Sequence, residues 1–471
     1  MRIQLHHIVP LALLWLGCGA ETPVAEAPPT ETAALAQELS MLQLADTQGL
    51  LGDLVGVEVA GSFQREQVAG DVYHYSFQLQ VGSSEHDVIT LHRVVREKAP
   101  FRPARGRESV FMVHGDVWNF TGAFMASTLT QDVPVDHSIA VYLAKRGVDV
   151  WGIDLRWTHV PLETEDFSFM ESWNIGTHAQ DIGKGLAVAR RVRALTGSGD
   201  GRMNLLGWSR GALLGYAYLN AESLRPAAQR HVSGFIPVDM AVHFGDDAAQ
   251  QRQWACERAA VAEAAWKQGR VEGGLLGPGA GVPVMMLGQA AIYMPSAIAM
   301  PPMPPLPYDQ LATLMGAATF QFLGTNPTVP FYHFTAGKFG ASPLPEGLQY
   351  VRSRQFFDLL ANARPYQSFQ EVMESEQLMC GKDLPDGKDL PYDDHLAQVK
   401  VPALYVGAGG GFGEYGLTTF NKLGGKDKSS LIVKRMPDQA RIADYGHADL
   451  FLASDADTAV WGPIHEWMKR H

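Results

Sequence analysis

The sequence predicts an α/β fold in which a mainly parallel central sheet is flanked by helices and interrupted by a large, mostly helical inserted cap. Apolar runs and stretches with helical spacing alternate from about residue 109 to residue 239, and the alternation resumes at residue 395. Such alternation is typical of a parallel sheet with crossover helices. Between residues 245 and 394 the chain is dense in Met, Pro, Ala and aromatic residues and shows no regular strand period, which indicates the cap.

The predicted core elements follow one another in a simple order. The segment Asp71–Glu97 alternates polar and apolar residues on both sides of "GSSEHD", which predicts a β-hairpin. The strands and helices expected after it are a strand at Ser109–Gly115, a helix at Ser138–Gly147, a strand at Val148–Trp157, a helix at Gly176–Gly197, a strand at 202–208, a helix at 211–222 and a strand at Val232–Asp239. After the cap we expect a helix, a strand and a glycine-rich loop within His395–Gly416, a last strand at 429–438 and a closing helix at 458–471.

Composition excludes some classes of function. The chain has 471 residues, 46% of them hydrophobic, which is ample for a large folded core. Its formal net charge of −12 argues against nucleic acid as a main partner. It has no basic cluster that would indicate a polyphosphate site or an electrostatic membrane patch.

The N-terminus has the features of a targeting segment. Arg2 precedes the short apolar run at residues 8–16, which is too short to span a bilayer. The small residue before Cys18 resembles a bacterial lipoprotein signal, in which the cysteine becomes a lipidated N-terminus; Trp15 stands where leucine is usual. Plain secretion and a cytoplasmic location are the alternatives. The Pro-, Ala-, Thr- and Glu-rich stretch at residues 21–36 has the composition of a tether.

These changes in composition divide the chain into five parts. Residues 1–18 are expected to be the signal peptide and residues 19–50 a tether. Residues 51–244 and 395–471 form the two parts of the α/β core, and residues 245–394 form the cap. We therefore expect an extracytoplasmic protein that contacts a membrane through its N-terminal lipid anchor.

The stretch "NLLGWSRGALLG" places a serine at the junction of a predicted strand and a predicted helix. Gly207, Ser209 and Gly211 have the spacing of a nucleophile elbow, a turn so sharp that the flanking positions must be small and the serine hydroxyl stands exposed. The following helix N-terminus favours developing negative charge there. The spacing also occurs by chance, so the surrounding strands and helices must support the interpretation.

That context resembles the α/β-hydrolase superfamily, over about residues 70–244 and 395–471. The segments "SFQLQVGSSEHDVITLHRV", "VHG", "SIAVYLAKRGVDVWGIDLRW" and "GWSRG" are most similar to the acid and gastric lipase branch. The elbow of that branch usually has His and Gln where this chain has Trp208 and Arg210. The helix–strand stretch also resembles polyhydroxyalkanoate polymerases, whose nucleophile is cysteine, so Ser209 favours hydrolysis over chain growth.

The resemblance implies a serine, acid and histidine triad in that chain order. Ser209 is the expected nucleophile, and His447 in "YGHADLF" is the expected base, because it follows the last strand. The expected acid is Glu414, in the glycine-rich loop after the "VPALYVG" strand. Asp239, at the end of the preceding strand, is the alternative acid, and Asp438 is a third candidate.

Two backbone N–H groups are expected to stabilise the oxyanion, those of Arg210 and Asp116. A carboxylate beside an anionic intermediate is unfavourable, so the Asp116 side chain must point away or hold another group. His114 is expected to brace this loop. The Arg210 side chain would either reach an acidic group of the substrate or form a surface salt bridge.

Two cysteines remain after Cys18. In an oxidising compartment Cys256 and Cys380 could form a disulfide, and two buried free thiols are an equal alternative.

We expect no cofactor and no metal. The sixteen histidines show no metal-ligand spacing, and "GAGGGFG" lacks the context of a dinucleotide-binding motif. The expected function is hydrolysis of a small, apolar carboxylic ester through an acyl-enzyme, lipase- or esterase-like. A thioesterase, an acyltransferase or a polyester depolymerase would use the same triad, and a non-catalytic binding lipoprotein of the same fold is the rival from another class. The methionines of the cap would line an apolar cavity or simply pack its interior.

Overall fold

The computed structural model describes residues 57–274, 277–324, 326–381 and 389–471. The predicted signal peptide, Cys18 and the predicted tether lie outside the described residues. Among the described residues, no helix combines the length and the apolar character needed to cross a membrane.

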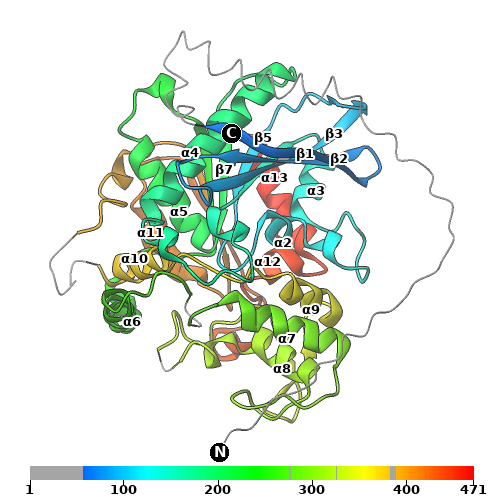
Figure 1. The fold of residues 1–471 in the computed structure, drawn as a ribbon, viewed down its shortest axis with the longest axis vertical. Helices are drawn as coiled ribbons and strands as arrows, with labels where there is room; N and C mark the ends of the chain where they lie inside the picture. The colour runs from blue at the N-terminus through cyan, green and yellow to red at the C-terminus, as the bar shows by residue number, and fades with distance from the viewer. Residues whose placement is uncertain (1–56, 275–276, 325, 382–388) are drawn as a thin grey trace, which may run out of the picture.

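A ten-stranded mixed sheet forms the centre of the molecule (Figure 1). Its main path runs β1-β2-β3-β6-β5-β7-β8-β11-β12, and β4 pairs with β3. The strands from β1 to β6 along this path pair antiparallel, and those from β6 to β12 pair parallel. The strands are β1 (Glu58–Ala69), β2 (Val72–Gln80), β3 (Val88–Ala99), β4 (Arg102–Pro103), β5 (Ser109–Val113), β6 (Asp149–Asp154), β7 (Met203–Trp208), β8 (Val232–Val238), β11 (Ala403–Ala408) and β12 (Lys428–Val433). The predicted α/β fold with a mainly parallel sheet is confirmed.

The parallel strands are buried on both faces, as their unbroken apolar sequences predict. Every residue of β5, "SVFMV", is buried. Because side chains alternate along a strand, Phe111 and Val113 belong to one core cluster, while Val110 and Met112 belong to the other. The sheet therefore separates two hydrophobic cores.

Helices cover both faces of the sheet (Figure 1). The helices α4 (Ile175–Leu195) and α5 (Arg210–Glu222) pack in the first core, and α3 (Ile139–Lys145) and α13 (Gly462–Met468) pack in the second. Three short helices complete the core: α2 (Phe120–Phe124), α11 (Leu417–Asn421) and α12 (Asp449–Leu452). Asn174 begins α4 by accepting a hydrogen bond from the Thr177 N–H, which is the usual role of an N-cap.

The inserted segment lies below the sheet in Figure 1 and is mostly helical. Its elements are α6 (Ala249–Lys267), α7 (Gly281–Tyr293), α8 (Tyr308–Ala317), α9 (Ser353–Ala361), α10 (Phe369–Cys380) and a two-stranded sheet of β9 (Gly337–Phe339) and β10 (Pro345–Leu348). A disulfide between Cys256 and Cys380 joins α6 to the end of α10.

One stretch of this segment makes backbone hydrogen bonds with two loops of the core. The N–H of His447 donates to the His333 carbonyl, and the N–H of Ala448 donates to the Phe334 carbonyl. The His333 N–H in turn donates to the Gly410 carbonyl. Residues 333–334 therefore lie between two core loops and hold the loop that carries His447.

Candidate active site

Ser209 occupies a strained turn between β7 and α5. Its φ of 57° and ψ of −129° lie in a region that side-chain-bearing residues rarely adopt. A Cβ at Gly207 would lie 2.3 Å from the Gly211 carbonyl oxygen, and a Cβ at Gly211 would lie 2.1 Å from that of Val113. Both positions must therefore be glycine for this turn to form, which is the geometry of a nucleophile elbow.

His447 is oriented by the carboxylate of Asp239. The imidazole Nδ1 lies 2.7 Å from Asp239 Oδ2, and both side chains are almost fully buried. Asp239 directly follows β8 and itself has a positive φ of 48°. Since the carboxylate accepts at Nδ1, the imidazole Nε2 is left as the nitrogen that can accept a proton.

The structure contradicts the prediction that Glu414 is the acid. Glu414 is exposed and makes no hydrogen bond with His447, whereas Asp239, the alternative, makes one. Asp438 is also exposed and pairs with Lys434. The physical reason is that β8 ends next to β11 in the sheet, so that Asp239 projects from a neighbouring strand end toward the histidine loop.

The glycine-rich loop after β11 wraps around the Asp239 carboxylate. The N–H groups of Ala408 and Gly413 donate to Oδ1 at 2.8 and 2.9 Å, and that of Phe412 donates to Oδ2 at 3.1 Å. A Cβ at Gly411 would lie only 1.9 Å from Oδ2. The glycines therefore allow a close backbone approach to a carboxylate from another strand, instead of positioning one of their own.

Four aromatic rings surround the His447 imidazole. Trp208 stacks on it with ring centroids 5.0 Å apart and an angle of 24°. Tyr332, Phe334 and Phe412 contact it at steeper angles. The sequence showed Trp208 only as a departure from the lipase elbow, and nothing in it indicated this stacking. Aromatic faces attract cations, so the stacked Trp208 ring would stabilise a positive charge on this imidazole.

The loop after β5 approaches the nucleophile from the other side. A Cβ at Gly115 would lie 2.7 Å from the Cβ of Ser209. Among the described residues, neither the Asp116 N–H nor the Arg210 N–H donates a hydrogen bond. Both N–H groups are thus free of other partners, as the oxyanion role predicted for them requires.

His114 fixes this loop. Its Nδ1 lies 2.9 Å from the Gly115 carbonyl oxygen, and its Nε2 accepts from the Leu155 N–H at 3.1 Å. Burial lowers the pKa of His114, which keeps the ring neutral. The ring can then donate at Nδ1 and accept at Nε2, so it braces the loop, as expected.

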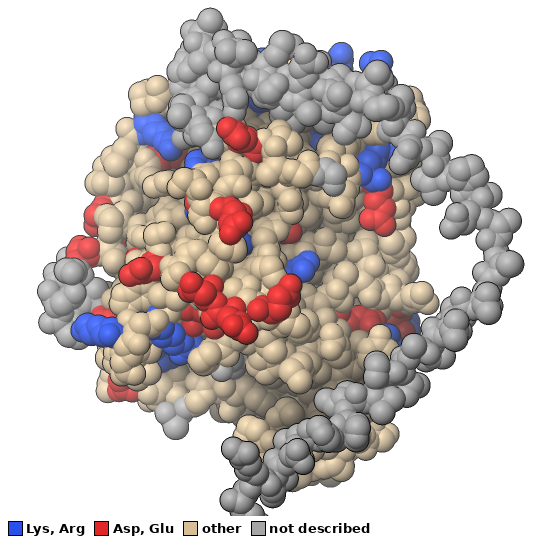
Figure 2. Space-filling view, in the orientation of Figure 1, with Lys and Arg blue, Asp and Glu red and all other residues tan. Residues whose placement is uncertain are grey.

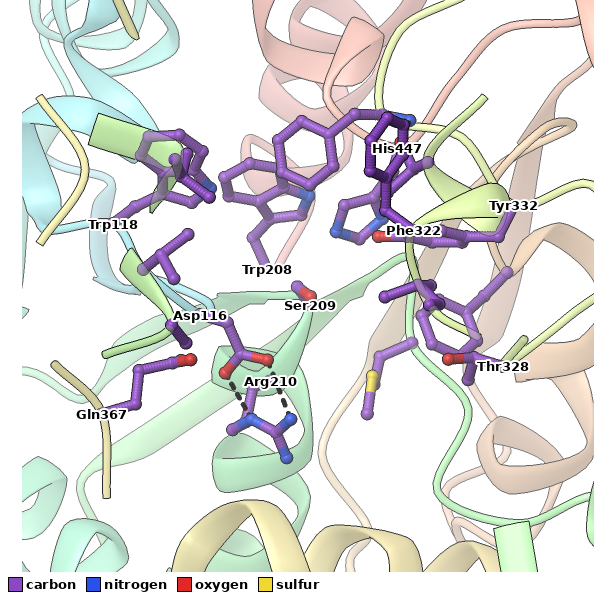
Figure 3. A pocket seen from close by; sticks show the side chains of 18 of the residues that line it. Asp116, Trp118, Trp208, Ser209, Arg210, Phe322, Thr328, Tyr332, Gln367 and His447 are labelled. Atoms are coloured by element: carbon purple, nitrogen blue, oxygen red, sulfur yellow. Dashed lines mark hydrogen bonds and ion pairs between the residues drawn. The ribbon is translucent and has the colours of Figure 1, made fainter. Parts of the chain in front are cut away.

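The side chains of Arg210 and Asp116 form a bidentate ion pair, drawn with dashed lines in Figure 3. Arg210 also donates to the Ser375 hydroxyl of α10. Burial alone would lower the pKa of Arg210, but the Asp116 carboxylate raises it above its ordinary value. Arg210 is therefore a buried structural cation, neither a surface salt bridge nor free for an acidic substrate, and the Asp116 carboxylate is held by it.

A cavity of about 140 Å³ joins these groups (Figure 3). Ser209 and His447 both line it, and most of the other walls are apolar. Among the described residues, the Ser209 hydroxyl has no hydrogen-bond partner. Such catalytic contacts often tighten only when substrate binds. The apolar lining side chains are Val117, Trp118, Trp208, Met240, Ala280, Val284, Met315, Phe322, Leu323, Phe334, Phe356, Leu360, Met379 and Phe412.

The methionines of the cap divide between the predicted cavity lining and a place that neither sequence interpretation foresaw. Met315 and Met379 line the cavity. Met286, Met294 and Met300 are instead exposed by more than half of their surface. They neither line the site nor pack the interior of the cap.

One group of side chains in the described residues lies close enough together to share a cation. These are Asp389, Asp393 and Asp394, of which two are exposed. None of them lines the cavity of Ser209.

Comparison with known proteins shows the fold. No family model matches the sequence, and no curated protein is significantly similar to it. A solved structure from Sulfolobus solfataricus, provisionally described as a lipase, is 18% identical with a TM-score of 0.56, covering 87% of this chain and 99% of that one. The chain thus has the α/β-hydrolase fold.

Two further structures are more distant. A soluble variant of monoglyceride lipase from Saccharomyces cerevisiae is 11% identical with a TM-score of 0.40, covering 87% of this chain and 94% of that one. A thermophilic esterase from Thermogutta terrifontis is 13% identical with a TM-score of 0.38, covering 86% of this chain and 98% of that one. These two likenesses are too weak to carry an argument.

Proposed function

We propose that this protein is a serine hydrolase that cleaves apolar carboxylic esters through an acyl-enzyme. The observation that carries the proposal is the hydrogen bond between Asp239 and His447, on a cavity that also holds Ser209 at a strained elbow. The three groups have the chain order and the roles of a nucleophile, an acid and a base.

In the first half of the reaction the Ser209 Oγ attacks the ester carbonyl carbon. His447 Nε2 takes the hydroxyl proton, and Asp239 stabilises the resulting imidazolium through Nδ1. The carbonyl π electrons move to oxygen, where the N–H groups of Arg210 and Asp116 donate to the negative charge. Collapse of this intermediate breaks the ester C–O bond, and the imidazolium gives its proton to the leaving alkoxide.

In the second half a water molecule attacks the acyl-enzyme. His447 accepts a proton from the water, and the same two N–H groups stabilise the second oxyanion. When this intermediate collapses, Ser209 leaves as the alcohol after protonation by His447. The products are the free acid and the regenerated enzyme.

The cavity favours an apolar substrate. Its walls carry side chains such as Trp118, Phe322, Phe356 and Leu360, against few polar groups. Tyr332 contributes a hydroxyl, and burial raises the pKa of that phenol well above its ordinary value, so it stays neutral. An acyl chain or an aromatic alcohol of modest size would fill this space.

A thioesterase, an acyltransferase or a polyester depolymerase would use the same triad and remains the alternative. The acyl donor and the acyl acceptor distinguish these enzymes. A thioesterase prefers thioesters over esters of the same acyl group. An acyltransferase yields a new ester when alcohols compete with water. A non-catalytic binding lipoprotein is the rival outside enzymes. The contact between Asp239 and His447 argues against it, because a site without turnover does not need an oriented imidazole.

The test is labelling of the purified protein with a fluorophosphonate probe, which reacts only with an activated serine. We expect the wild type to be labelled at Ser209, and the variants Ser209→Ala and His447→Ala to remain unlabelled. Asp239→Asn should slow labelling by about 100-fold or more. Glu414→Gln is the matched control and should be labelled at the wild-type rate.

Two outcomes would contradict the proposal. If the wild type stays unlabelled while a control hydrolase reacts, Ser209 is not activated. That result would favour a non-catalytic binding protein. If Glu414→Gln slows labelling and Asp239→Asn does not, the acid is misassigned. A panel of p-nitrophenyl esters and matched thioesters of graded chain length then separates ester from thioester preference.

We also propose that the protein is extracytoplasmic and anchored by a lipid on Cys18. The lipoprotein-like signal and the tether composition support this. In a bacterial host supplied with labelled palmitate, the wild type should carry the label and Cys18→Ala should not. Equal labelling of both would contradict the anchor.

A further inference from the structure

We propose that the segment from Met286 to Pro305 docks the cap onto the surface of a lipid bilayer. The 36 residues from Gly273 to Tyr308 contain no charged residue and no histidine, in a chain that is 19% charged. A contiguous exposed apolar patch on a soluble protein often marks a contact with a partner or a membrane, so the exposed part of this stretch is a candidate contact surface.

The described part of the segment is strongly exposed. Six of the thirteen exposed large apolar side chains among the described residues lie in it. Tyr293 is 80% exposed and Met300 is 70% exposed, although both would be favoured in an interior. The six are Met286, Tyr293, Met294, Ile298, Met300 and Met303.

The outermost part is a hydrogen-bonded stem that carries a tip. The Ala299 N–H donates to the Leu306 carbonyl, and the Tyr308 N–H donates to the Ala297 carbonyl. These bonds close the stem and leave residues 300–305, "MPPMPP", as the methionine–proline tip, in which every residue is exposed. The closed stem, in which Ala299 is buried, presents the exposed tip to solvent.

The tip has few backbone N–H groups that would lose their hydrogen bonds to water in a bilayer. Four of its six residues are prolines, which have no N–H. Of the two remaining N–H groups, that of Met303 already donates to the Met300 carbonyl. Unpaired backbone donors are a main cost of placing a chain segment in an apolar medium, so this tip enters the acyl boundary of a bilayer at low cost.

The docking segment is continuous with the walls of the active-site cavity. In α7, Val284 lines the cavity, while Met286 and Tyr293 on the same helix are exposed. The next helix, α8, begins immediately after the stem and contributes Met315 to the cavity. A bilayer at this surface would therefore contact elements that also enclose the reacting serine.

A bilayer suits this surface better than a protein partner. The tip is exposed, and a lipid surface accepts an exposed apolar tip without a complementary groove. Tyr293 is amphipathic and suits the headgroup level. In Figure 2 the lower end of the molecule, where α7 and α8 lie, shows neither acidic nor basic side chains wherever grey atoms leave it visible.

The predicted anchor is compatible with this orientation. The chain from Cys18 to Val57, the first described residue, can span up to about 130 Å when extended. The tether therefore does not restrict which face of the domain meets the membrane, and anchoring keeps the docking segment at high local concentration near lipid.

The test measures binding of the mature chain to vesicles. The chain from residue 18 onward carries Cys18→Ser, so that no lipid anchor contributes, and is floated with phosphatidylcholine vesicles. We expect a substantial bound fraction that does not fall between 0.1 and 1 M NaCl, because no charge mediates it. The double variant Met300→Ser, Met303→Ser should lower the partition coefficient about tenfold or more.

Two control variants make the result specific. Met300→Leu with Met303→Leu keeps the apolar tip and should bind like the wild type. Leu195→Ser with Leu224→Ser removes two exposed apolar side chains from the α/β core and should also bind like the wild type. The substituted side chains are all exposed, and equal melting temperatures would verify that the variants are folded.

Several outcomes would overturn the proposal. These are a wild type that does not float, serine variants that float equally well, or binding that is lost at high salt. Concentration-dependent dimerisation of the wild type that the serine variants abolish, without vesicle binding, would assign the surface to a second copy of the chain. The inference does not depend on the proposed function, because Ser209→Ala should float like the wild type.

Discussion

Gly411 determines whether the Asp239 carboxylate can occupy its place beside the imidazole. A Cβ at this position would lie 1.9 Å from Asp239 Oδ2, the oxygen that contacts His447. Gly411→Ala is therefore expected to displace the acid and to lower kcat/KM for a p-nitrophenyl ester by about 100-fold or more. Gly201→Ala, where a Cβ meets nothing within 4 Å, is the matched control. An unchanged rate in Gly411→Ala would show that Asp239 does not serve as the acid.

Trp208 stabilises the base through its ring. Its stacking on His447 predicts that Trp208→Leu lowers kcat about tenfold, the effect of losing one to two kcal/mol of cation–π attraction in the charged transition state. Trp208→Phe keeps an aromatic face and should lose less. Steady-state kinetics on one ester measures both. Equal losses in the two variants would mean that the ring acts by filling space.

The sequence locates Ser209 and His447 because each lies in a short local motif. The choice between Asp239 and Glu414 is different, since it depends on which strand end lies beside the histidine loop. That depends on the neighbours of β8 in the sheet and on the path of a glycine-rich loop, both long-range properties. The stacking of Trp208 is also set by tertiary packing, so no local pattern could have indicated it.

At the scale of elements, Asp449 connects the loop that carries His447 to Ala336, the residue before β9. Its Oδ2 accepts from the N–H groups of Gly446 and Ala336, at 2.6 and 2.8 Å. Burial raises the pKa of Asp449 to about 7, against about 4 in an unfolded chain. Between about pH 4 and pH 7 the Asp449 carboxyl is therefore protonated in the folded state and ionised in the unfolded chain. The stability that this proton brings is complete below about pH 4 and is lost as the pH rises through 7.

Asp449→Asn should remove most of this dependence. We expect the wild type to lose up to about 4 kcal/mol of unfolding free energy between pH 4 and pH 8 from this group, and the variant to lose only what other groups contribute. Burial also raises the pKa of Glu374 to about 7, so a smaller fall in the same direction should persist. Urea midpoints at pH 4 and pH 8 measure the difference. Asp438→Asn, at an exposed position, should behave like the wild type; an Asp449→Asn variant that does so would contradict the assignment.

The disulfide ties α10, which contacts Arg210, to α6. α10 carries Ser375, which Arg210 contacts, and Cys380 fixes the end of that helix to α6. Cys256→Ser should lower the unfolding free energy by about 2–4 kcal/mol. It should also raise KM more than it lowers kcat, because the triad lies on the core. A melting temperature unaffected by either the variant or a reductant would contradict this role.

The core elements follow from the sequence because strand and helix periods are local. β1 was not predicted, since "EVAGSFQREQVA" contains too few apolar residues to show a strand period. The contact of residues 333–334 with the histidine loop could not be predicted either. It consists of backbone hydrogen bonds, which any sequence could make. The pairing of Cys256 with Cys380 needed the distance between α6 and α10, which the sequence does not contain.

At the scale of the whole molecule, charge and apolar surface act in opposite directions at a membrane. The net charge of −12 repels anionic lipid, while the methionine–proline tip, residues 300–305, is uncharged. Figure 2 shows acidic side chains over the visible face, but not at the lower end. The docking proposed for the uncharged tip therefore favours neutral regions of a lipid surface over anionic ones.

The negative net charge and the uncharged apolar tip together predict how binding depends on lipid charge and on salt. The mature chain with Cys18→Ser should bind vesicles containing 30% phosphatidylglycerol more weakly than pure phosphatidylcholine vesicles at 20 mM salt. Raising the salt should strengthen binding to the anionic vesicles until the two values converge, because the Debye length falls from about 20 Å to a few ångströms. A docking surface that depended on basic side chains would show the reverse order and the reverse salt dependence, and that result would reject a bilayer contact made by the uncharged tip.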